Sequence, residues 1–294
     1  MTTVHTIETL DGAARQPFEH LTFRHVREAF YNDSPGMQTY VIGSRTNGQP
    51  SGLVVLDRRQ GEQAARVLSF FVGTQFRQRG VATSLMAAMN DLAQQMGISQ
   101  FSLEYVVGRN TPILEHVLAQ NGWGQPAVIL FIYKTDLAHI AHAKWIKPMR
   151  LPAEFTFIPI RQLSKAQVLE IINHEARGYP AYLNPFKDAA RIHPDLTWFL
   201  LHQDQVVGWS IVHAIAPDTV LYNSLYVDHD YQQLGMPFML VAESIRQQAK
   251  MGIQNGMFSV LIGNQRMRKI IDSKLLPYIT QQQEMRKCVK DHAV

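Results

Sequence analysis

The sequence of 294 residues predicts a mixed α/β fold that occurs twice in tandem. First, similar residues recur at an offset of 155 positions. Second, each half shows the same order of elements: a hairpin, a buried strand, a helix, a strand, a helix and a last strand. Coincidence among common residues is the alternative, but several matches at one offset favour two copies of one fold. The recurring pairs are Val72 and Val227, Gly80 and Gly235, Met96 and Met251, Gly97 and Gly252, and Gly108 and Gly263.

The first copy is predicted from its turn signals and its apolar periodicity. Asn47-Gly48 between two apolar runs is a strong hairpin signal. Residues 65–72 are apolar, as expected of a buried central strand. Apolar residues then recur at helical spacing from Val81 until Gly97 ends the helix. The predicted elements are strands at 39–44, 51–57, 65–72, 100–107 and 127–134, of which the last closes the sheet, and helices at 81–96 and 111–120.

The second copy is predicted to repeat this order after a linker. Its elements are a hairpin of strands 198–202 and 205–213, strands at 219–227, 256–262 and 278–289, and helices at 237–251 and 265–275. Helices ahead of the two hairpins are expected near 23–32 and 164–175. The expected domains are therefore residues 1–140 and 153–294, joined by a linker at 141–152 that contains Trp145, Pro148 and Pro152.

Length and composition bound the class of protein. A chain of this length accommodates two domains of about 150 residues. The contents of 46% hydrophobic and 18% charged residues exclude a disordered chain, and no apolar run approaches the roughly 20 residues of a membrane helix. The N-terminus lacks the pattern of a signal peptide. A single cysteine, Cys288, excludes an internal disulfide and a multi-cysteine zinc site, so a reducing, cytoplasmic location is the simplest expectation.

The formal net charge is +4, and the basic residues are not gathered into a stripe. We therefore expect neither a nucleic acid nor a membrane as partner. The mild positive excess suits a small phosphorylated ligand.

The junction between strand 65–72 and helix 81–96 carries the clearest chemical signal. The free N–H groups of a helix's first turn, together with the helix dipole, favour an anion at that point. Gly80 and Ala82 let a phosphate approach the backbone closely, and Arg77 and Arg79 add positive charge. The sequence therefore predicts a diphosphate-binding loop without a Walker lysine.

This junction resembles the signature of the GCN5-related N-acetyltransferase (GNAT) superfamily. The family pattern, [Gln/Arg]-x-x-Gly-x-[Gly/Ala] with a valine five residues ahead, is matched by Val72, Arg77, Gly80 and Ala82. Residues 102–106 resemble the family's fifth strand, and Asn110 and Gly122-Trp123 resemble its next segment. The resemblance covers about residues 20–135 well and 155–290 weakly. It implies two tandem GNAT-like domains, each a mostly antiparallel central sheet flanked by helices.

The resemblance also implies the cofactor and the reaction. Acetyl-CoA, or another acyl-CoA, would be the acyl donor, its pyrophosphate bound by residues 77–83 and its pantetheine arm paired with residues 70–72. The protein would then be an N-acetyltransferase that moves the acetyl group to the primary amine of a small molecule by direct attack, with no metal involved. The implied cofactor-binding residues are Phe71, Val72, Arg77, Gln78, Arg79, Gly80, Val81, Ala82, Thr83 and Asn110.

The second copy departs from this signature. Gln232 and Gly235 fit it, but Pro237 stands at the position of Ala82 and has no N–H to offer. Leu234 replaces Arg79, while Asp228 and Asp230 add negative charge. We expect a degenerate copy that completes the substrate site or shapes the cleft. The alternative is that Pro237 merely starts a helix and that the loop still binds acetyl-CoA.

Three residues of the first copy are candidates for catalysis. The tyrosine acid that many family members carry is absent, because Val117 and Leu118 occupy that region. Glu104 is either a general base beside the thioester or a surface glutamate. Tyr105 points to the opposite strand face and is either catalytic or core filler. His116 reaches the cleft from its helix or lies on the helix surface. No histidine spacing indicates a metal site, and Ser84 and Ser102 lack a nearby histidine for nucleophilic catalysis.

Aromatic residues are frequent in the second copy. Trp198, Trp209, Tyr222 and Tyr226 either line a cleft or fill the core. The segment 178–185 holds two tyrosines between prolines and is either a substrate lid or a packed connector.

Two other functions remain open from the sequence. The protein could bind CoA without catalysis, as a sensor or a partner-binding platform. It could also use a different acyl donor or decarboxylate an acyl-CoA. Either a monomer or a homodimer is compatible with two tandem copies.

Overall fold

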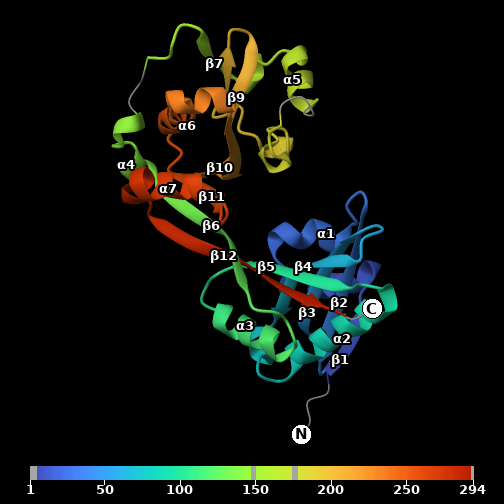
Figure 1. Ribbon diagram of the computed structural model, residues 1–294. Helices are drawn as coiled ribbons and strands as arrows, with labels where there is room; N and C mark the ends of the chain where they lie inside the picture. Colours follow the sequence, from blue (N-terminus) through green and yellow to red (C-terminus); the bar gives the residue numbers. More distant parts are fainter. Residues whose placement is uncertain (1–4, 147–149, 174–177, 293–294) are drawn as a thin grey trace. The chain divides into compact units, whose positions relative to one another are not determined.

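The computed structural model describes residues 5–146, 150–173 and 178–292 (Figure 1). These residues form two compact units. Unit 1 comprises Met1–Ile129 together with Glu284–Val294, and unit 2 comprises Leu130–Gln283. Each is a mostly antiparallel sheet flanked by helices, so the predicted fold class is confirmed. Among the described residues, no helix is both long and apolar enough to cross a membrane.

The sheet of unit 1 has the order β1-β2-β3-β4-β5-β12. All its neighbours are antiparallel except β4 and β5, which are parallel. Asn47 and Gly48 both have positive φ and close the β2–β3 hairpin, as the sequence predicts. The strands are β1 (His5–Thr9), β2 (Met37–Thr46), β3 (Gln49–Arg59), β4 (Ala64–Val72), β5 (Gln100–Val106) and β12 (Gln281–Asp291).

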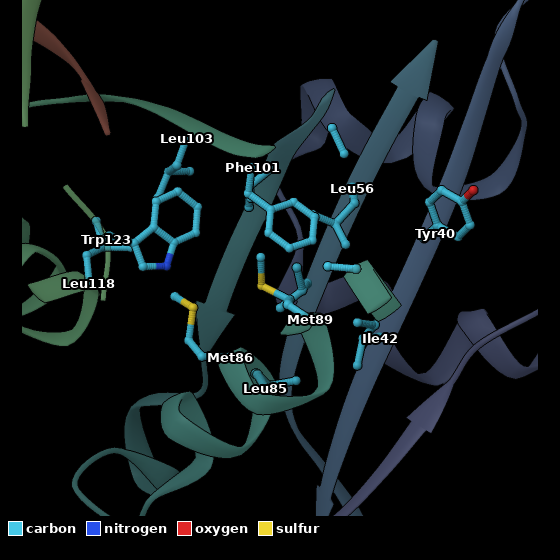
Figure 2. Close-up of a cluster of buried hydrophobic side chains, with 14 of the residues drawn as sticks. Tyr40, Ile42, Leu56, Leu85, Met86, Met89, Phe101, Leu103, Leu118 and Trp123 are labelled. Atoms are coloured by element: carbon cyan, nitrogen blue, oxygen red, sulfur yellow. The ribbon is translucent and has the colours of Figure 1, made fainter. Parts of the chain in front are cut away.

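The main core of unit 1 lies between this sheet and helices α2 (Val81–Met96) and α3 (Thr111–Gln120). Figure 2 shows Met86 and Met89 of α2 pointing toward Phe101 of β5 and toward Trp123. A second core forms under the 3₁₀ helix η1 (Gly12–Leu21) and α1 (Arg27–Tyr31), and it includes Phe18, Phe30 and Val41. The sheet is therefore covered by helices over both of its faces.

Unit 2 repeats this plan with the strand order β6-β11-β10-β9-β8-β7. Only β10 and β11 are parallel. The strands are β6 (Ala127–Asp136, in unit 2 from Leu130), β7 (Phe155–Pro159), β8 (Trp198–His202), β9 (Gln205–Ala216), β10 (Thr219–Val227) and β11 (Asn255–Leu261). The helices are α4 (Leu137–Ile140), α5 (Lys165–Ile172), α6 (Met236–Lys250) and α7 (Gln265–Ile270), the last continued by a π turn, Ile271–Leu275.

The final strand of each half lies in the unit of the other half. Residues 127–134 form a strand as predicted, but Leu130–Asp136 pair with β11 in unit 2, so the expectation that they close the first sheet was wrong. Instead β12, at the end of the chain, pairs with β5 in unit 1 (Figure 1). The compact units therefore differ from continuous domains at 1–140 and 153–294. Periodicity predicts that a segment is a strand, whereas its partner is decided by tertiary packing.

The predicted linker and front helices are only partly described. In the expected linker, residues 144–146 form a short 3₁₀ helix, while Pro148 falls outside the described residues. Helix α5 begins at Lys165, capped by Ser164, whose side chain accepts a hydrogen bond from the Gln167 N–H. The expected end of that helix, at 174–175, also falls outside the described part of the chain.

The two parallel pairs share a feature that positions the candidate sites. Strand β4 pairs with β5 only from Ala64 to Val67, and β10 pairs with β11 only from Thr219 to Tyr222. The next residue, Leu68 in one strand and Asn223 in the other, is the extra residue of a β-bulge. Beyond the bulge the parallel strands are no longer paired. The 155-residue repeat therefore reproduces the place where each sheet opens.

Candidate functional site

The loop after β4 turns the chain tightly from strand to helix. The Gly73 N–H donates to the Ser51 carbonyl at 2.9 Å, which holds the loop against β3. A short 3₁₀ turn, Thr74–Phe76, follows and buries Phe76 in the core. Gln78 and Gly80 then have φ values of 61° and 83°, so the chain makes two left-handed steps before α2 begins. Glycine makes the second step at little cost.

The first turn of α2 presents unpaired backbone donors. Gly80 is the N-cap and provides no side chain for capping. The Ser84 N–H donates to the Gly80 carbonyl at 3.0 Å, whereas the N–H groups of residues 81–83 have no partner among the described residues. A Cβ at Gly80 would meet no atom within 4 Å, so the space in front is open. Three free donors at a helix N-terminus form a site for an anion.

Two cationic side chains flank this helix N-terminus. Arg77 lies over the Phe71 ring, with its Cζ 6.0 Å from the centroid, and its Nε donates to the Val72 carbonyl at 3.3 Å. Arg79 is exposed. Its carbonyl is bound by Nε2 of His5 at 2.5 Å, while Nδ1 of His5 lies 2.8 Å from the Thr46 hydroxyl. His5, which lies on β1, therefore holds the loop in place. The spacing of histidines in the sequence does not indicate this role.

The remaining cofactor-binding candidate, Asn110, caps helix α3 only through its backbone. Its exposed side chain accepts no capping hydrogen bond. The Leu114 N–H donates to its carbonyl at 3.1 Å, and the Gly108 N–H donates to the Thr111 hydroxyl at 2.8 Å. The Asn110 amide is thus left available to a ligand.

The two candidate residues on β5, the carboxylate Glu104 and the phenol Tyr105, lie on opposite faces of the strand. Glu104 is on the face away from the α2 core, with its side chain 46% exposed and its Oε1 3.7 Å from Lys287 Nζ. Tyr105 packs against the core, and its hydroxyl donates to Glu115 of α3 at 2.7 Å. Burial, and secondarily that hydrogen bond, raise the pKa of Tyr105, so it stays neutral. His116, also on α3, is exposed, and no described residue bonds to it.

Glu115 also joins α3 to β12. Arg286 donates to Glu115 at 2.9 Å and to Glu284 at 2.7 Å. Burial works to raise the pKa of Glu115, but hydrogen bonds from Tyr105 and Arg286 outweigh it and leave the pKa lowered. No sequence pattern links these residues, because Arg286 reaches the site from the far end of the chain.

The lowered pKa of Glu115 predicts a pH-dependent stability. A carboxylate with a lowered pKa contributes its full stabilisation above the ordinary glutamate value of 4.5 and loses it as the pH falls through the lowered value. We expect Glu115→Gln to destabilise the protein by about 1 kcal/mol at neutral pH, since the ion pair is partly exposed. The difference from wild type should shrink as the pH falls below 4.5 and through the lowered pKa. Thermal melts across this range check it, and a constant difference at every pH would contradict it.

The equivalent junction of unit 2 offers fewer donors. Gly235, with φ 76°, is again the N-cap, and Pro237 lacks an N–H. The Phe238 N–H is already used, because it donates to the Gly235 carbonyl at 3.0 Å. Gln232 occupies the place of Arg77 and likewise donates to the strand end, the Val227 carbonyl, at 2.7 Å. The backbone plan is the same, but in the first turn, residues 236–238, Met236 alone has an N–H that no described residue is shown to bind.

The aromatic candidates of unit 2 lie in two kinds of surroundings, the core and the wall of a cavity. Trp209 is fully buried, and its indole N–H donates to the Ser224 hydroxyl at 3.1 Å. Tyr226 packs against Trp209, and Trp198 packs at the edge of a neighbouring cluster, so these three are core residues. Tyr222 instead lines a cavity. In the segment 178–185, Tyr179 is buried and donates to the Ile171 carbonyl at 2.8 Å, whereas Tyr182 is 56% exposed beside that cavity.

No group of three or more side chains suited to a metal ion occurs among the described residues.

Comparisons with known proteins agree with this architecture. Residues 5–115 match the model of the acetyltransferase (GNAT) family. A tandem GNAT protein from the clavulanic acid biosynthesis pathway is similar with a TM-score of 0.69 and 12% identity, over 92% of this chain and 87% of that one. A GCN5-related N-acetyltransferase from Sphaerobacter thermophilus has a TM-score of 0.57 and 13% identity, over 97% and 88%. An acetyltransferase from the GNAT family of Colwellia psychrerythraea has a TM-score of 0.55 and 10% identity, over 97% and 100%.

No curated protein matches the chain significantly. At 10–13% identity, the likeness to solved structures shows a shared fold alone. The family match over residues 5–115 supports acyl-CoA-dependent acetyl transfer in general. Residues 5–115 thus resemble the acetyltransferase (GNAT) family, and nearly the whole chain has a fold similar to that of a tandem GNAT protein.

Proposed function

We propose that the protein is an N-acetyltransferase whose unit 1 binds acetyl-CoA and moves the acetyl group to the primary amine of a small molecule. The observation that carries this proposal is the helix N-terminus at residues 81–83. Its three free N–H groups, flanked by Arg77 and Arg79, match the charge and size of a diphosphate. The residues present therefore fit the cofactor.

The opening of the sheet provides room for the pantetheine arm. Because β4 pairs with β5 only as far as Val67, one backbone edge of residues 69–72 has no strand partner. That edge, including Phe71 and Val72, can hold the arm through backbone hydrogen bonds. A backbone N–H there would polarise the thioester carbonyl. When bound, acetyl-CoA supplies a thioester whose acetyl group passes to the amine with release of the CoA thiolate.

We assign proton removal to Glu104 rather than to Tyr105 or His116. Glu104 is exposed on the strand face away from the α2 core, one residue beyond the part of β5 that pairs with β4. It can take the proton of the ammonium group directly or through a water molecule. The hydroxyl of Tyr105 is committed to Glu115, so this residue positions α3 instead of donating a proton. A thiolate is a good leaving group, which makes a dedicated acid dispensable.

The role of Glu104 predicts the kinetics of one variant. Glu104→Gln is expected to lower kcat by about a hundredfold. Acetyl-CoA affinity should stay unchanged. Ser102→Ala, on the same strand face, is the matched control and should retain full activity. Steady-state kinetics checks this, and an undiminished kcat in Glu104→Gln would assign the base to another group.

A second candidate function is CoA binding without catalysis. The hydroxyl of Tyr105 already donates to Glu115, and neither residue 117 nor residue 118 is a tyrosine. Both observations favour binding without catalysis. Calorimetric titration with acetyl-CoA, followed by turnover with a panel of primary amines, separates the two. A stoichiometry near one with turnover supports the transferase, binding without turnover supports the sensor, and no binding overturns both.

A further inference from the structure

Unit 2 contains a cavity of about 520 Å³ at the place where its sheet opens. Its walls come from the diverging strands β10 and β11 and from helices α6 and α7. Tyr182 and Lys187, both exposed, lie at its edge. A volume of this order is typical of a site for a small organic molecule.

The walls are mainly apolar. Among the lining residues the structure describes, only Asp136 and Lys187 are charged, and Asp136 is already bound by the backbone and ring of His139 at 2.9 and 2.6 Å. The remaining walls are dominated by aliphatic and aromatic side chains, among them Trp145, Phe238, Val241, Phe258 and Val260. Such walls favour an apolar ligand.

The polar groups of one wall satisfy one another. The Tyr222 hydroxyl donates to Gln248 Oε1 at 2.5 Å, and Gln248 Nε2 donates to the Ile253 carbonyl at 2.8 Å. Thr135 donates to the Tyr278 carbonyl at 2.7 Å. These groups need no hydrogen bond from a ligand. Because their dipoles are fixed and already paired, they would stabilise a charged ligand little.

Two polar groups on the walls lack partners among the described residues. Asn223, the bulge residue of β10, is half-buried with its amide unpaired. The indole N–H of Trp145 is buried without a hydrogen bond. The indole only donates, while the amide both donates and accepts. Together they select a ligand that carries an acceptor oxygen.

The cavity is poorly suited to a nucleotide diphosphate. The N-terminus of α6 reaches it through Pro237 and Phe238, of which the first has no N–H and the second has already donated its own. In unit 1 the corresponding residues are Ala82 and Thr83, whose N–H groups are free. The neighbouring Asp228 and Asp230 add negative charge, and Gln232 and Leu234 stand where unit 1 has Arg77 and Arg79. Unit 2 has thus kept the opening of the sheet and lost the anion site.

We infer that the cavity of unit 2 is a binding site for a neutral, largely apolar small molecule that carries an acceptor oxygen, held by Asn223 and Trp145 between β10, β11 and α6. This assignment is independent of whether unit 1 transfers an acetyl group. It gives the second copy a ligand of its own rather than a second molecule of acetyl-CoA.

The test uses the full-length protein and prodan, a neutral naphthyl ketone whose emission moves to the blue in apolar surroundings. We expect saturable binding of one prodan per chain, with a blue shift. Val241→Trp, which fills the cavity from α6, should weaken binding at least about tenfold. Lys250→Trp adds the same side chain to the exposed end of α6, outside the lining, and should leave binding unchanged.

Two further variants keep the inference testable if Val241→Trp fails to fold. Asn223→Leu keeps the side-chain volume, removes the hydrogen bond and should weaken prodan binding about fivefold to tenfold. Ser259→Trp narrows the cavity from an exposed position of β11 and should also weaken it. Thermal melts confirm folding of each variant. No binding to wild type, or undiminished binding to every variant that folds, overturns the inference. So does an acetyl-CoA stoichiometry of two with displacement of prodan, which would make the cavity a nucleotide site.

Discussion

Ala82→Pro is expected to weaken acetyl-CoA binding to unit 1 by about tenfold to a hundredfold. The substitution removes one of the three N–H groups that would bind the diphosphate in the proposed complex, and a hydrogen bond to a charged group is worth roughly 1.5–3 kcal/mol. Proline is tolerated in the first turn of a helix. Unit 2 demonstrates this, because Pro237 occupies the same position there after a left-handed glycine. Calorimetric titration with acetyl-CoA gives the measurement.

The matched control is Ala82→Ser, which keeps the N–H at a half-buried position and should bind nearly as wild type. The reverse substitution, Pro237→Ala, restores a donor in unit 2 but leaves Asp228 and Asp230 in place. It should therefore create no second site. Unchanged affinity in Ala82→Pro would show that the diphosphate is bound elsewhere and would remove the main support for the proposed function.

Deletion of β12 is expected to destabilise unit 1 severely, although the deleted residues lie more than 170 positions from its other strands. Cys288 of β12 is fully buried in the unit 1 core, and its thiol donates to the Gly124 carbonyl at 2.9 Å. Lys290 bonds to Asn90 of α2 and to the Asn121 carbonyl, both at 2.8 Å. Loss of one well-packed core side chain alone costs about 2–5 kcal/mol, and here a whole strand is lost.

A chain that ends at residue 280 should accordingly bind no acetyl-CoA and should show a lower Tm for unit 1. Removal of residues 293–294 alone is the control and should have no effect. A synthetic peptide of residues 281–294 should restore binding when added to the shortened chain. Full acetyl-CoA affinity without β12 would contradict the assignment of this strand to unit 1.

Local elements were predicted well because they depend on nearby residues. Periodicity and turn chemistry predict β2 to β5, α2 and α3, and Asn47-Gly48 forms its hairpin. The N-terminal strand β1 and the strand β7 were not predicted, since both are short edge strands with weak alternation. The bounds of β4, α2 and β5 recur, to within one residue, in β10, α6 and β11 at the 155-residue offset.

The junction at residues 77–83 was also predictable as a tight turn from strand to helix, because turn and helix-start signals are properties of consecutive residues. The sequence could not place Glu115 and Arg286 around Tyr105, since these side chains meet only after β12 has paired with β5. Nor could it separate Tyr222, which lines a cavity, from Trp209, which is core. Both are aromatic residues in neighbouring strands, and only packing distinguishes them.

By itself, then, the sequence determined the repeated α/β elements and the strand–loop–helix junction of the first copy. It also shows where the second copy departs from that junction, at Pro237 and the two aspartates. Tertiary structure alone decided that the last strands of the two halves lie in each other's units, and that unit 2 keeps an apolar cavity. The physical reason is the separation along the chain over which each kind of interaction acts. Turn, cap and helix preferences act between neighbours in sequence, whereas strand pairing and cavities arise from segments that meet only in the folded chain.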